Sequence, residues 1–323
     1  MTPPSLPRGS KLLAALRHQG AFVALIVAIV FGFARYAAFL TPENIVNIVR
    51  QNSMVGLVAL GMTFVILTGG IDLSVGAILA VAGIVLVQAA PYGAATAVLA
   101  AVGAAALIGL INGLLIAKAR IQPFITTLAM MIAARGFALA VTSENSIPLP
   151  DNSSGVAWIG RGEIGSVPVP VALIAIAFLL AWFALRYTRF GRYVYAVGDS
   201  LDAAKLLGLN VDRILILTYV VSGAFAGLAG VVLASRLGAA QPVAGTGWEL
   251  DAIAAVVVGG TVLTGGRGGA GLTLIGVLLL GVILNLLNLE GTVSPWWQWV
   301  IRGAFLLAVV VVQGRMQRKA ASA

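Results

Sequence analysis

Long apolar runs without a charged side chain alternate with short polar segments along most of the 323 residues. A helix needs about 20 apolar residues to cross the hydrocarbon core of a bilayer. The runs are continuous, whereas a membrane β-barrel shows alternating ten-residue segments. We therefore predict an all-α, polytopic transmembrane helical bundle of about ten spans. The expected spans are roughly residues 21–40, 54–69, 73–90, 93–117, 123–142, 168–187, 213–235, 250–264, 270–289 and 296–314.

Three of these assignments depend on breaks within apolar sequence. Residues 73–117 form 45 residues without a charge, too long for one crossing, and Pro91-Tyr92-Gly93 marks a turn within them. The segments 54–69 and 250–264 are short and flanked by glycine. Eight or nine full crossings therefore remain an alternative to ten.

One polar segment interrupts the pattern between two apolar runs, residues 189–213, RFGRYVYAVGDSLDAAKLLGLNVDR. The middle of this segment predicts a short helix, because residues typical of a helix start and of a helix end flank it. Asp199 or Ser200 is expected to cap the amino end, and Asp202 places negative charge in the first turn. Lys205 lies near the carboxyl end, where Gly208 supplies the left-handed residue that stops the helix.

Such a helix has about eight residues, and isolated helices shorter than about 12 are marginal in water. Packing against another surface must therefore hold it. Leu201, Ala204 and Gly208 share one side and form a small, shallow face that a groove would accept. The alternatives are a docking helix for a soluble partner and a solvated connector.

Composition and charge agree with a membrane protein. Apolar residues make up 60% of the chain and charged residues 10%, whereas soluble domains carry about 25% charged residues. With the amino terminus inside, fourteen Lys and Arg fall on the inner side and four on the outer side, as the positive-inside rule requires. The excess of basic residues is therefore attributed to inner loops, and nucleic-acid binding is not expected.

This orientation defines the expected organisation. Residues 1–20 form a cytoplasmic tail, 21–314 a transmembrane domain with residues 189–213 on its cytoplasmic side, and 315–323 a second cytoplasmic tail. The first apolar run lacks a small-x-small cleavage site, which predicts a retained span. The largest outer loop, residues 143–167, is rich in Pro, Ser, Gly and Asn and is expected to be irregular. The chain has no cysteine, which excludes disulfides and thiolate metal sites.

Several residues are candidates for chemistry inside the membrane. Asp72, at a junction between spans, is interpreted as a cap of the following helix, with a role at an inner gate as the alternative. The segment 265–271, GGRGGAG, lacks the Lys-Ser/Thr pair of a phosphate loop and is expected to be a tight turn. Two Gly-x-x-x-Gly pairs, at 109–113 and 223–227, predict close helix packing.

Three blocks of sequence resemble the permease subunits of ATP-binding-cassette (ABC) sugar importers, of the ribose and branched-chain-substrate permease family. They are GMTFVILTGGIDLSVGAILAVAG (61–83), the segment 189–213, and WELDAIAAVVVGGTVLTGGRG (248–268). The resemblance covers nearly all of the chain after residue 40. It implies a type II-like importer fold in the inner membrane of a bacterium, and a chain without enzymatic activity or cofactor. The implied partners are cytoplasmic ATPase subunits, a second permease chain and a periplasmic sugar-binding protein.

The resemblance also implies roles for individual residues. The middle block would carry the helix that docks on the ATPase, through Gly198, Asp199, Ser200, Asp202, Ala203, Ala204, Lys205 and Gly208. Asp199-Ser200 stands where the family has Gly-Asn, which keeps capping chemistry and leaves the contacts of these two residues open. A neutral sugar needs weakly binding polar groups along its path; the candidates for the path or gate are Asn52, Thr68, Asp72, Ser74, Asn112, Trp248, Glu249 and Asp251.

A finer resemblance, in residues 143–148, 194–199, 245–261 and 290–297, is to galactofuranose permeases that pair with a different permease chain. It implies galactofuranose as the sugar, with ribose, xylose or another monosaccharide as alternatives. From another class, an ion-coupled secondary transporter would place carboxylates at mid-membrane. In this sequence only Asp72 is a candidate for such a carboxylate.

Overall fold

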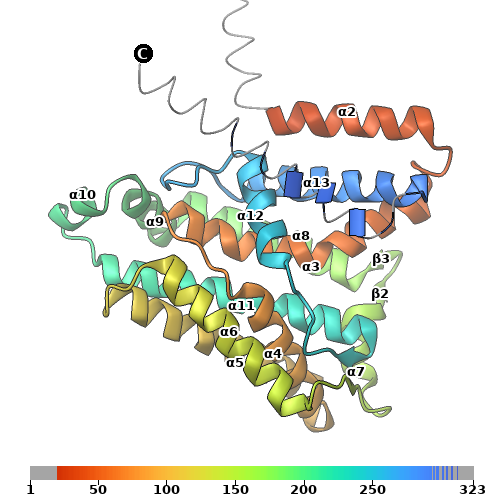
Figure 1. The fold of residues 1–323 in the computed structure, drawn as a ribbon, viewed down its shortest axis with the longest axis horizontal. Helices are drawn as coiled ribbons and strands as arrows, with labels where there is room; N and C mark the ends of the chain where they lie inside the picture. The colour runs from red at the N-terminus through yellow and green to blue at the C-terminus, as the bar shows by residue number, and fades with distance from the viewer. Residues whose placement is uncertain are drawn as a thin grey trace, which may run out of the picture.

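The computed structural model describes residues 20–292 and, beyond them, residues 294, 296, 297, 300, 301, 303, 304, 307 and 311. In this range the chain is mostly helical, with four two-residue strands. Figure 1 shows the arrangement. Residues 1–19 of the first predicted tail, all of the second, and most of the last expected span, 296–314, lie outside the described residues. The helices are α2 (Gly20–Arg35), α3 (Pro42–Leu67), α4 (Val75–Ala89), a 3-10 turn (Ala90–Tyr92), α5 (Ala94–Ala117), α6 (Pro123–Thr142), α7 (Ser154–Arg161), α8 (Val169–Tyr187), α9 (Arg189–Asp199), α10 (Leu201–Leu206), α11 (Val211–Leu237), α12 (Trp248–Gly259) and α13 (Ala270–Glu290).

Seven helical segments are long and apolar enough to cross a membrane among the described residues, so the expected count of about ten is not confirmed. They are α3, α4 with its 3-10 turn, α5, α6, α8, α11 and α13. The segment expected at 250–264 is the 12-residue α12. At 1.5 Å per residue it is about 18 Å long, well short of the roughly 30 Å hydrocarbon core. The first expected span, 21–40, corresponds to the 16-residue α2, which is about 24 Å long and is not among the seven.

The second span is longer than predicted, because α3 begins at Pro42. Thr41 caps its amino end by accepting a hydrogen bond from the Asn44 amide, and Glu43 lies in the first turn. Because the first turns of α3 contain polar residues, the hydropathy pattern predicts a start at residue 54, twelve residues too late. The later half of α3 is apolar on all sides and almost wholly buried, which makes α3 a central element of the bundle.

Helix α11 packs on α5 through the predicted glycine pairs. A Cβ on Gly109 would lie 2.3 Å from the carbonyl oxygen of Tyr219, and one on Gly223 would lie 2.4 Å from that of Ala105. Neither contact leaves room for a side chain. The sequence prediction of close helix packing is therefore confirmed, and the two pairs lie in the same interface.

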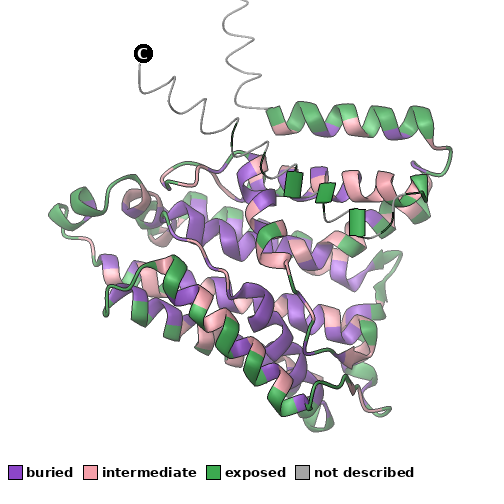
Figure 2. Ribbon diagram, in the orientation of Figure 1, coloured by how far each residue is buried: buried purple, intermediate pink, exposed green. Residues whose placement is uncertain are grey.

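The end of the bundle opposite α10 carries the strands (Figure 1). β1 (Ile147–Pro148) pairs with β4 (Ala239–Ala240), and β2 (Glu163–Ile164) pairs with β3 (Val167–Pro168). The loop 143–167, expected to be irregular, contains this short pairing and the eight-residue α7. Figure 2 shows that exposed residues line the outer side of α2, whereas α3, α4 and α11 each hold more buried residues than any other helix.

Candidate functional site

The predicted docking helix is present as α10, which spans six residues rather than about eight. Of the two possible caps, Ser200 is the one used: its side chain accepts a hydrogen bond from the Ala203 amide at 3.2 Å. Gly208 has a φ of +75° and ends the helix as predicted. Asp202 and Lys205 occupy the expected turns, with 3.9 Å between carboxylate and ammonium. Asp199 is the last residue of α9.

The exposed face of α10 differs from the predicted one. Ala204 is 1% exposed and belongs to the core of the bundle, whereas Leu201 and Gly208, the other two residues of the predicted face, are exposed. Leu206 and Leu207, at the carboxyl end of the helix, are 89% and 78% exposed. Together with the exposed Ala203, they form an exposed apolar surface at α10. The exposed apolar surface could have been predicted from the sequence, because Leu206 and Leu207 are two adjacent leucines in an otherwise polar segment.

Helix α9 joins α10 to the interior at one very close contact. A Cβ on Gly198 would lie 1.8 Å from the carbonyl oxygen of Leu67, the last residue of α3, and 2.6 Å from the amide nitrogen of Gly266. The Gly266 amide also donates to the Leu67 carbonyl at 3.0 Å. The Tyr195 hydroxyl donates to the Gly268 carbonyl at 2.9 Å, and burial raises the pKa of Tyr195, which keeps this donor protonated.

This contact, which we call the Gly198 junction, consists of Gly198, Leu67 and Gly266. It connects α9 to two non-helical segments, residues 68–74 between α3 and α4 and residues 260–269 between α12 and α13. The glycine-rich turn expected at 265–271 is therefore present, and it has a specific neighbour. Non-helical backbone within a membrane protein is tolerated where protein buries it or where it lines a cavity.

Segment 68–74 contains a buried polar network. Asp72 is 0% exposed, and its Oδ1 accepts hydrogen bonds from the Ser74 amide at 3.0 Å and from Ser74 Oγ at 2.5 Å. Its Oδ2 accepts a hydrogen bond from Ser222 Oγ of α11 at 2.8 Å. Asn112 of α5 donates from Nδ2 to Ser74 Oγ at 2.9 Å. The network thus holds the start of α4 against both α11 and α5.

The capping interpretation of Asp72 describes only half of its contacts. The bond to the Ser74 amide lies at the start of α4 and fits that interpretation, whereas the bond to Ser222 links α4 to a different helix. Lys118 and Asp212 form an ion pair at the α10 end of α5 and α11, at 2.9 Å. Ser222 lies ten residues after Asp212, so the network lies up to about 15 Å along the helix from that pair.

A second interruption precedes α12. Residues 241–247, which connect β4 to α12, are not helical. They approach α4 closely: a Cβ on Gly76, near the start of α4, would lie 2.3 Å from the carbonyl oxygen of Gly245. Glu249 Oε2 would lie 2.7 Å from the same Cβ. Trp248 and Glu249, two of the path candidates, are half-buried, and the carboxylate of Glu249 lies beside the start of α4. In Figure 1, α12 runs across the direction of α11 and α13.

Arg135 of α6 holds this second interrupted segment. Its Nη1 donates to the carbonyl oxygens of Pro242 at 2.5 Å and Ala244 at 2.8 Å. Arg135 lies well inside α6, and the unwound backbone of 241–247 offers it carbonyl acceptors that no sequence pattern reveals.

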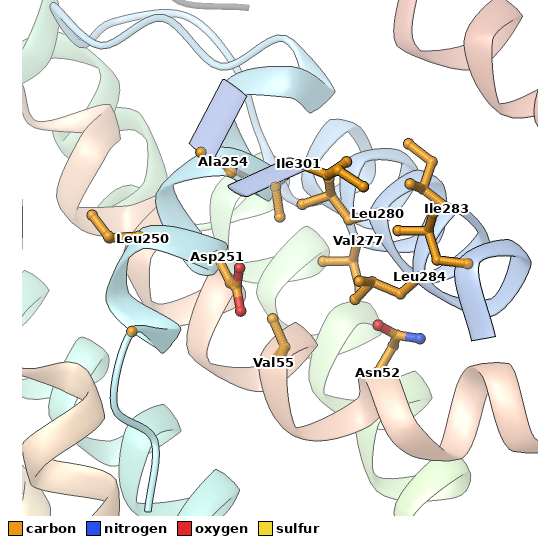
Figure 3. Close-up of a pocket in the computed structure, with 14 residues that line it drawn as sticks. Asn52, Val55, Leu250, Asp251, Ala254, Val277, Leu280, Ile283, Leu284 and Ile301 are labelled. Carbon is orange, nitrogen blue, oxygen red and sulfur yellow. The ribbon is translucent and has the colours of Figure 1, made fainter. Parts of the chain in front are cut away.

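The other path candidates separate into two places. Asn52 of α3 and Asp251 of α12 line a cavity of about 150 Å³ between α3, α12 and α13. Figure 3 shows both on the α3 and α12 side of this cavity, facing apolar side chains of α13 such as Leu280 and Leu284. Thr68 instead donates to the Val65 carbonyl at the end of α3 and lines a different pocket, beside α10. The eight candidates therefore do not form one site.

The chain matches the family model described as branched-chain amino acid transport system / permease component over residues 44–310. The chain belongs to this family. Among relatives of this permease, the ribose import permease protein RbsC of Escherichia coli (strain K12) is 44% identical over 308 residues, covering 94% of this chain and 96% of the relative. The ribose import permease protein RbsC of Bacillus subtilis (strain 168) is 45% identical over 302 residues, 92% of each chain.

The expected similarity to a galactofuranose permease is also found. The galactofuranose transporter permease protein YtfT of Escherichia coli (strain K12) is 39% identical over 273 residues, 84% of this permease and 79% of the relative. Because the two ribose permeases share higher identity, the similarity does not select galactofuranose as the sugar. No solved structure matches this permease.

Proposed function

We propose that this chain is the permease subunit of an ATP-driven importer of a neutral monosaccharide, and that it forms half of the translocation path. The observation that carries the proposal is the Gly198 junction. Through it, α9, which is followed directly by the exposed helix α10, is in contact with the end of α3, just before the segment that leads into α4, and with the loop that follows α12. A force on α10 would therefore reach both interrupted elements.

In this mechanism the partner of α10 is a cytoplasmic ATPase. Its closure on ATP would push α10, and the Gly198 junction would pass the displacement to segments 68–74 and 260–269. Asp72 would keep segment 68–74 in register with α11, and Arg135 would hold segment 241–247, before α12, in register with α6, because each side chain bonds across elements rather than within one. The permease performs no bond chemistry, and ATP hydrolysis belongs to the ATPase.

The sugar path itself would form beside α12, where Asn52 and Asp251 face an otherwise apolar cavity. A weakly polar wall suits a neutral polyol that must leave as readily as it enters. A second permease chain, identical or different, would complete the path, and a periplasmic binding protein would deliver the sugar at the end that carries the strands. Ribose and galactofuranose, the sugars named for the relatives, are the two substrates to test first.

The test is sugar uptake into proteoliposomes that contain the permease, the candidate ATPase and the binding protein. We expect uptake of a radiolabelled monosaccharide only with ATP on the α10 side. Uptake driven by a proton or sodium gradient without any ATPase would contradict the proposal and would favour the ion-coupled transporter.

The sidedness has a separate test, because the chain has no native cysteine. Ala203→Cys in α10 and Asn152→Cys in the loop before α7 both lie at exposed positions. In intact cells, a membrane-impermeant maleimide should label Asn152→Cys, whereas Ala203→Cys should react only after lysis. The reverse pattern would refute the assignment of α10 to the cytoplasm.

A further inference from the structure

Tyr219 is a buried polar residue that the mechanism above does not use. It lies in the first half of α11, is 0% exposed, and packs with Val65 of α3 and Ile116 of α5. Its hydroxyl has no hydrogen-bond partner within the described part of the chain. A buried hydroxyl without a partner costs free energy, because its bonds to water are lost and not replaced. A phenylalanine ring would fill the same space without that cost.

A strong acceptor lies close to this hydroxyl. The carboxylate of Asp72 acts electrostatically on Tyr219. The hydroxyl lies against Gly70, where a Cβ would come within 2.5 Å of it, and Gly70 is only two residues before Asp72. Two residues of extended chain span at most about 7 Å. A relative displacement of α11 and segment 68–74 within this limit would therefore bring the hydroxyl to the carboxylate.

Asp72 already has one partner on the same side of α11. Its Oδ2 accepts the hydrogen bond from Ser222 Oγ at 2.8 Å. Tyr219 and Ser222 are three residues apart, and residues at this spacing are neighbours on a helix surface. Helix α11 thus carries two neighbouring hydroxyl donors for one carboxylate. The donor at Ser222 is bonded, and the donor at Tyr219 is not.

The contacts of α11 with the helices beside it are made through glycine. Its two glycine pairs lie against α5, and a Cβ on Gly230 would come within 2.3 Å of the Leu79 carbonyl oxygen of α4. At these contacts no side chain projects from the glycine to block a shift along the helix. Small sliding movements of packed helices are one of the common ways in which proteins change between two arrangements.

We infer that Asp72 and α11 form a two-position latch, in which Asp72 accepts from Ser222 in the present arrangement and from the Tyr219 hydroxyl in a second one. The role in transport rests on the proposed function, because alternating access needs two arrangements of segment 68–74. In the second arrangement the Tyr219 hydroxyl gains a partner, which offsets the loss of the Ser222 bond. Asn112 Oδ1 also lacks a partner among the described residues, but a charged acceptor forms hydrogen bonds about twice as strong.

A double-mutant cycle on the purified full-length chain, in nanodiscs and without any ATPase, tests this exchange. In the parent, Tyr219→Phe should leave the unfolding temperature unchanged or raise it, because the hydroxyl has no partner to lose. Ser222→Ala removes the present bond, so that Tyr219 takes over Asp72 and recovers part of the loss. In that background Tyr219→Phe should lower the unfolding temperature by several degrees. Thr218→Val, which loses only a bond within α11, is the matched background in which Tyr219→Phe should stay neutral.

Pulsed dipolar spectroscopy on the same chain measures the displacement. Cysteine-linked labels replace Arg213, exposed at the start of α11, and Arg267, exposed in the loop whose residue Thr264 lies against Gly69. Ser222→Ala should add a second distance that is minor or undetected in the parent. Adding Tyr219→Phe should reduce the population of this second distance about tenfold, the effect expected for one hydrogen bond to a charged acceptor.

An equal effect of Tyr219→Phe in the parent and in the Ser222→Ala background would overturn the inference, because a purely structural tyrosine behaves in that way. Loss of stability on Tyr219→Phe in the parent would also overturn it, since the hydroxyl would then already have a partner such as Asn112. Both results are obtained without sugar or ATPase. A chain that shows the exchange but fails to import sugar would refute the proposed function and leave the latch standing.

Discussion

Replacing Gly198 with alanine tests the junction that links α10 to the interior. Gly198 lies in the last turn of α9 and has no left-handed backbone, so alanine is allowed at this position by conformation alone. Helix propensity by itself predicts that Gly198→Ala stabilises the protein by at most about 1 kcal/mol. The contact with Leu67 predicts the opposite sign.

The magnitude follows from the distance. A new Cβ would lie 1.8 Å from the Leu67 carbonyl oxygen, whereas a relaxed carbon–oxygen contact needs about 3.3 Å, so the two segments must separate by roughly 1.5 Å. Overpacking of this kind costs about 1–3 kcal/mol. Weakening the bond from the Gly266 amide to Leu67 adds about 1 kcal/mol. We expect a net loss of about 1–3 kcal/mol.

The matched control is Gly136→Ala in α6. Gly136 is also helical, and a Cβ there would meet nothing within 4 Å. Unfolding in mixed micelles should show this variant equal to or slightly more stable than the parent, and Gly198→Ala less stable. In proteoliposomes, Gly198→Ala should still bind the ATPase while sugar imported per ATP hydrolysed falls at least several-fold. Equal stability and equal coupling in the two variants would refute the role of the junction.

Three further changes test the other contacts. Ser222→Ala removes one hydrogen bond to the buried Asp72 carboxylate and should cost about 1–2 kcal/mol of unfolding free energy. The control, Thr218→Val one turn earlier, loses only a hydrogen bond within its own helix and should cost less. Equal losses in the two variants would contradict a specific role of the network. Arg135→Gln should reduce uptake at least tenfold without reducing ATPase binding, and Arg135→Lys should retain part of the activity; normal uptake by Arg135→Gln would contradict the clamp on residues 242–244. Leu207→Asp should prevent co-purification with the ATPase while the chain still inserts, and an intact complex would show that α10 does not dock through its exposed leucines.

Local features of the fold could be predicted because neighbouring residues determine them. The cap at Ser200 and the stop at Gly208 depend on side chains and backbone freedom within one short segment. The glycine pairs of α5 and α11 predict close packing from their spacing alone, and the structure supplies only the partner. The polar segment 189–213 could likewise be recognised from its contrast with the apolar runs around it.

The interrupted elements could not be predicted in the same way. An apolar segment such as 250–264 has the composition of a span whether its helix has 12 residues or 20, because hydropathy does not report where the backbone unwinds. The acceptors of Arg135 are main-chain carbonyls more than 100 residues away, and the partner of Asp72 on α11 is a serine without any distinguishing pattern. Tertiary packing determines these contacts, and no local signal records them.

The central claim is that α10 and the loop after α12 move together when the ATPase closes. Pulsed dipolar spectroscopy on double-cysteine variants measures this directly, with labels at Ala203 and Arg267 in one variant and at Ala119 and Arg267 in another, all exposed positions. Between the nucleotide-free and the vanadate-trapped complex, the distance from Ala203 to Arg267 should stay constant while that from Ala119 to Arg267 changes. A constant Ala119–Arg267 distance together with a changed Ala203–Arg267 distance would show that α10 moves without the interior, and it would contradict the mechanism.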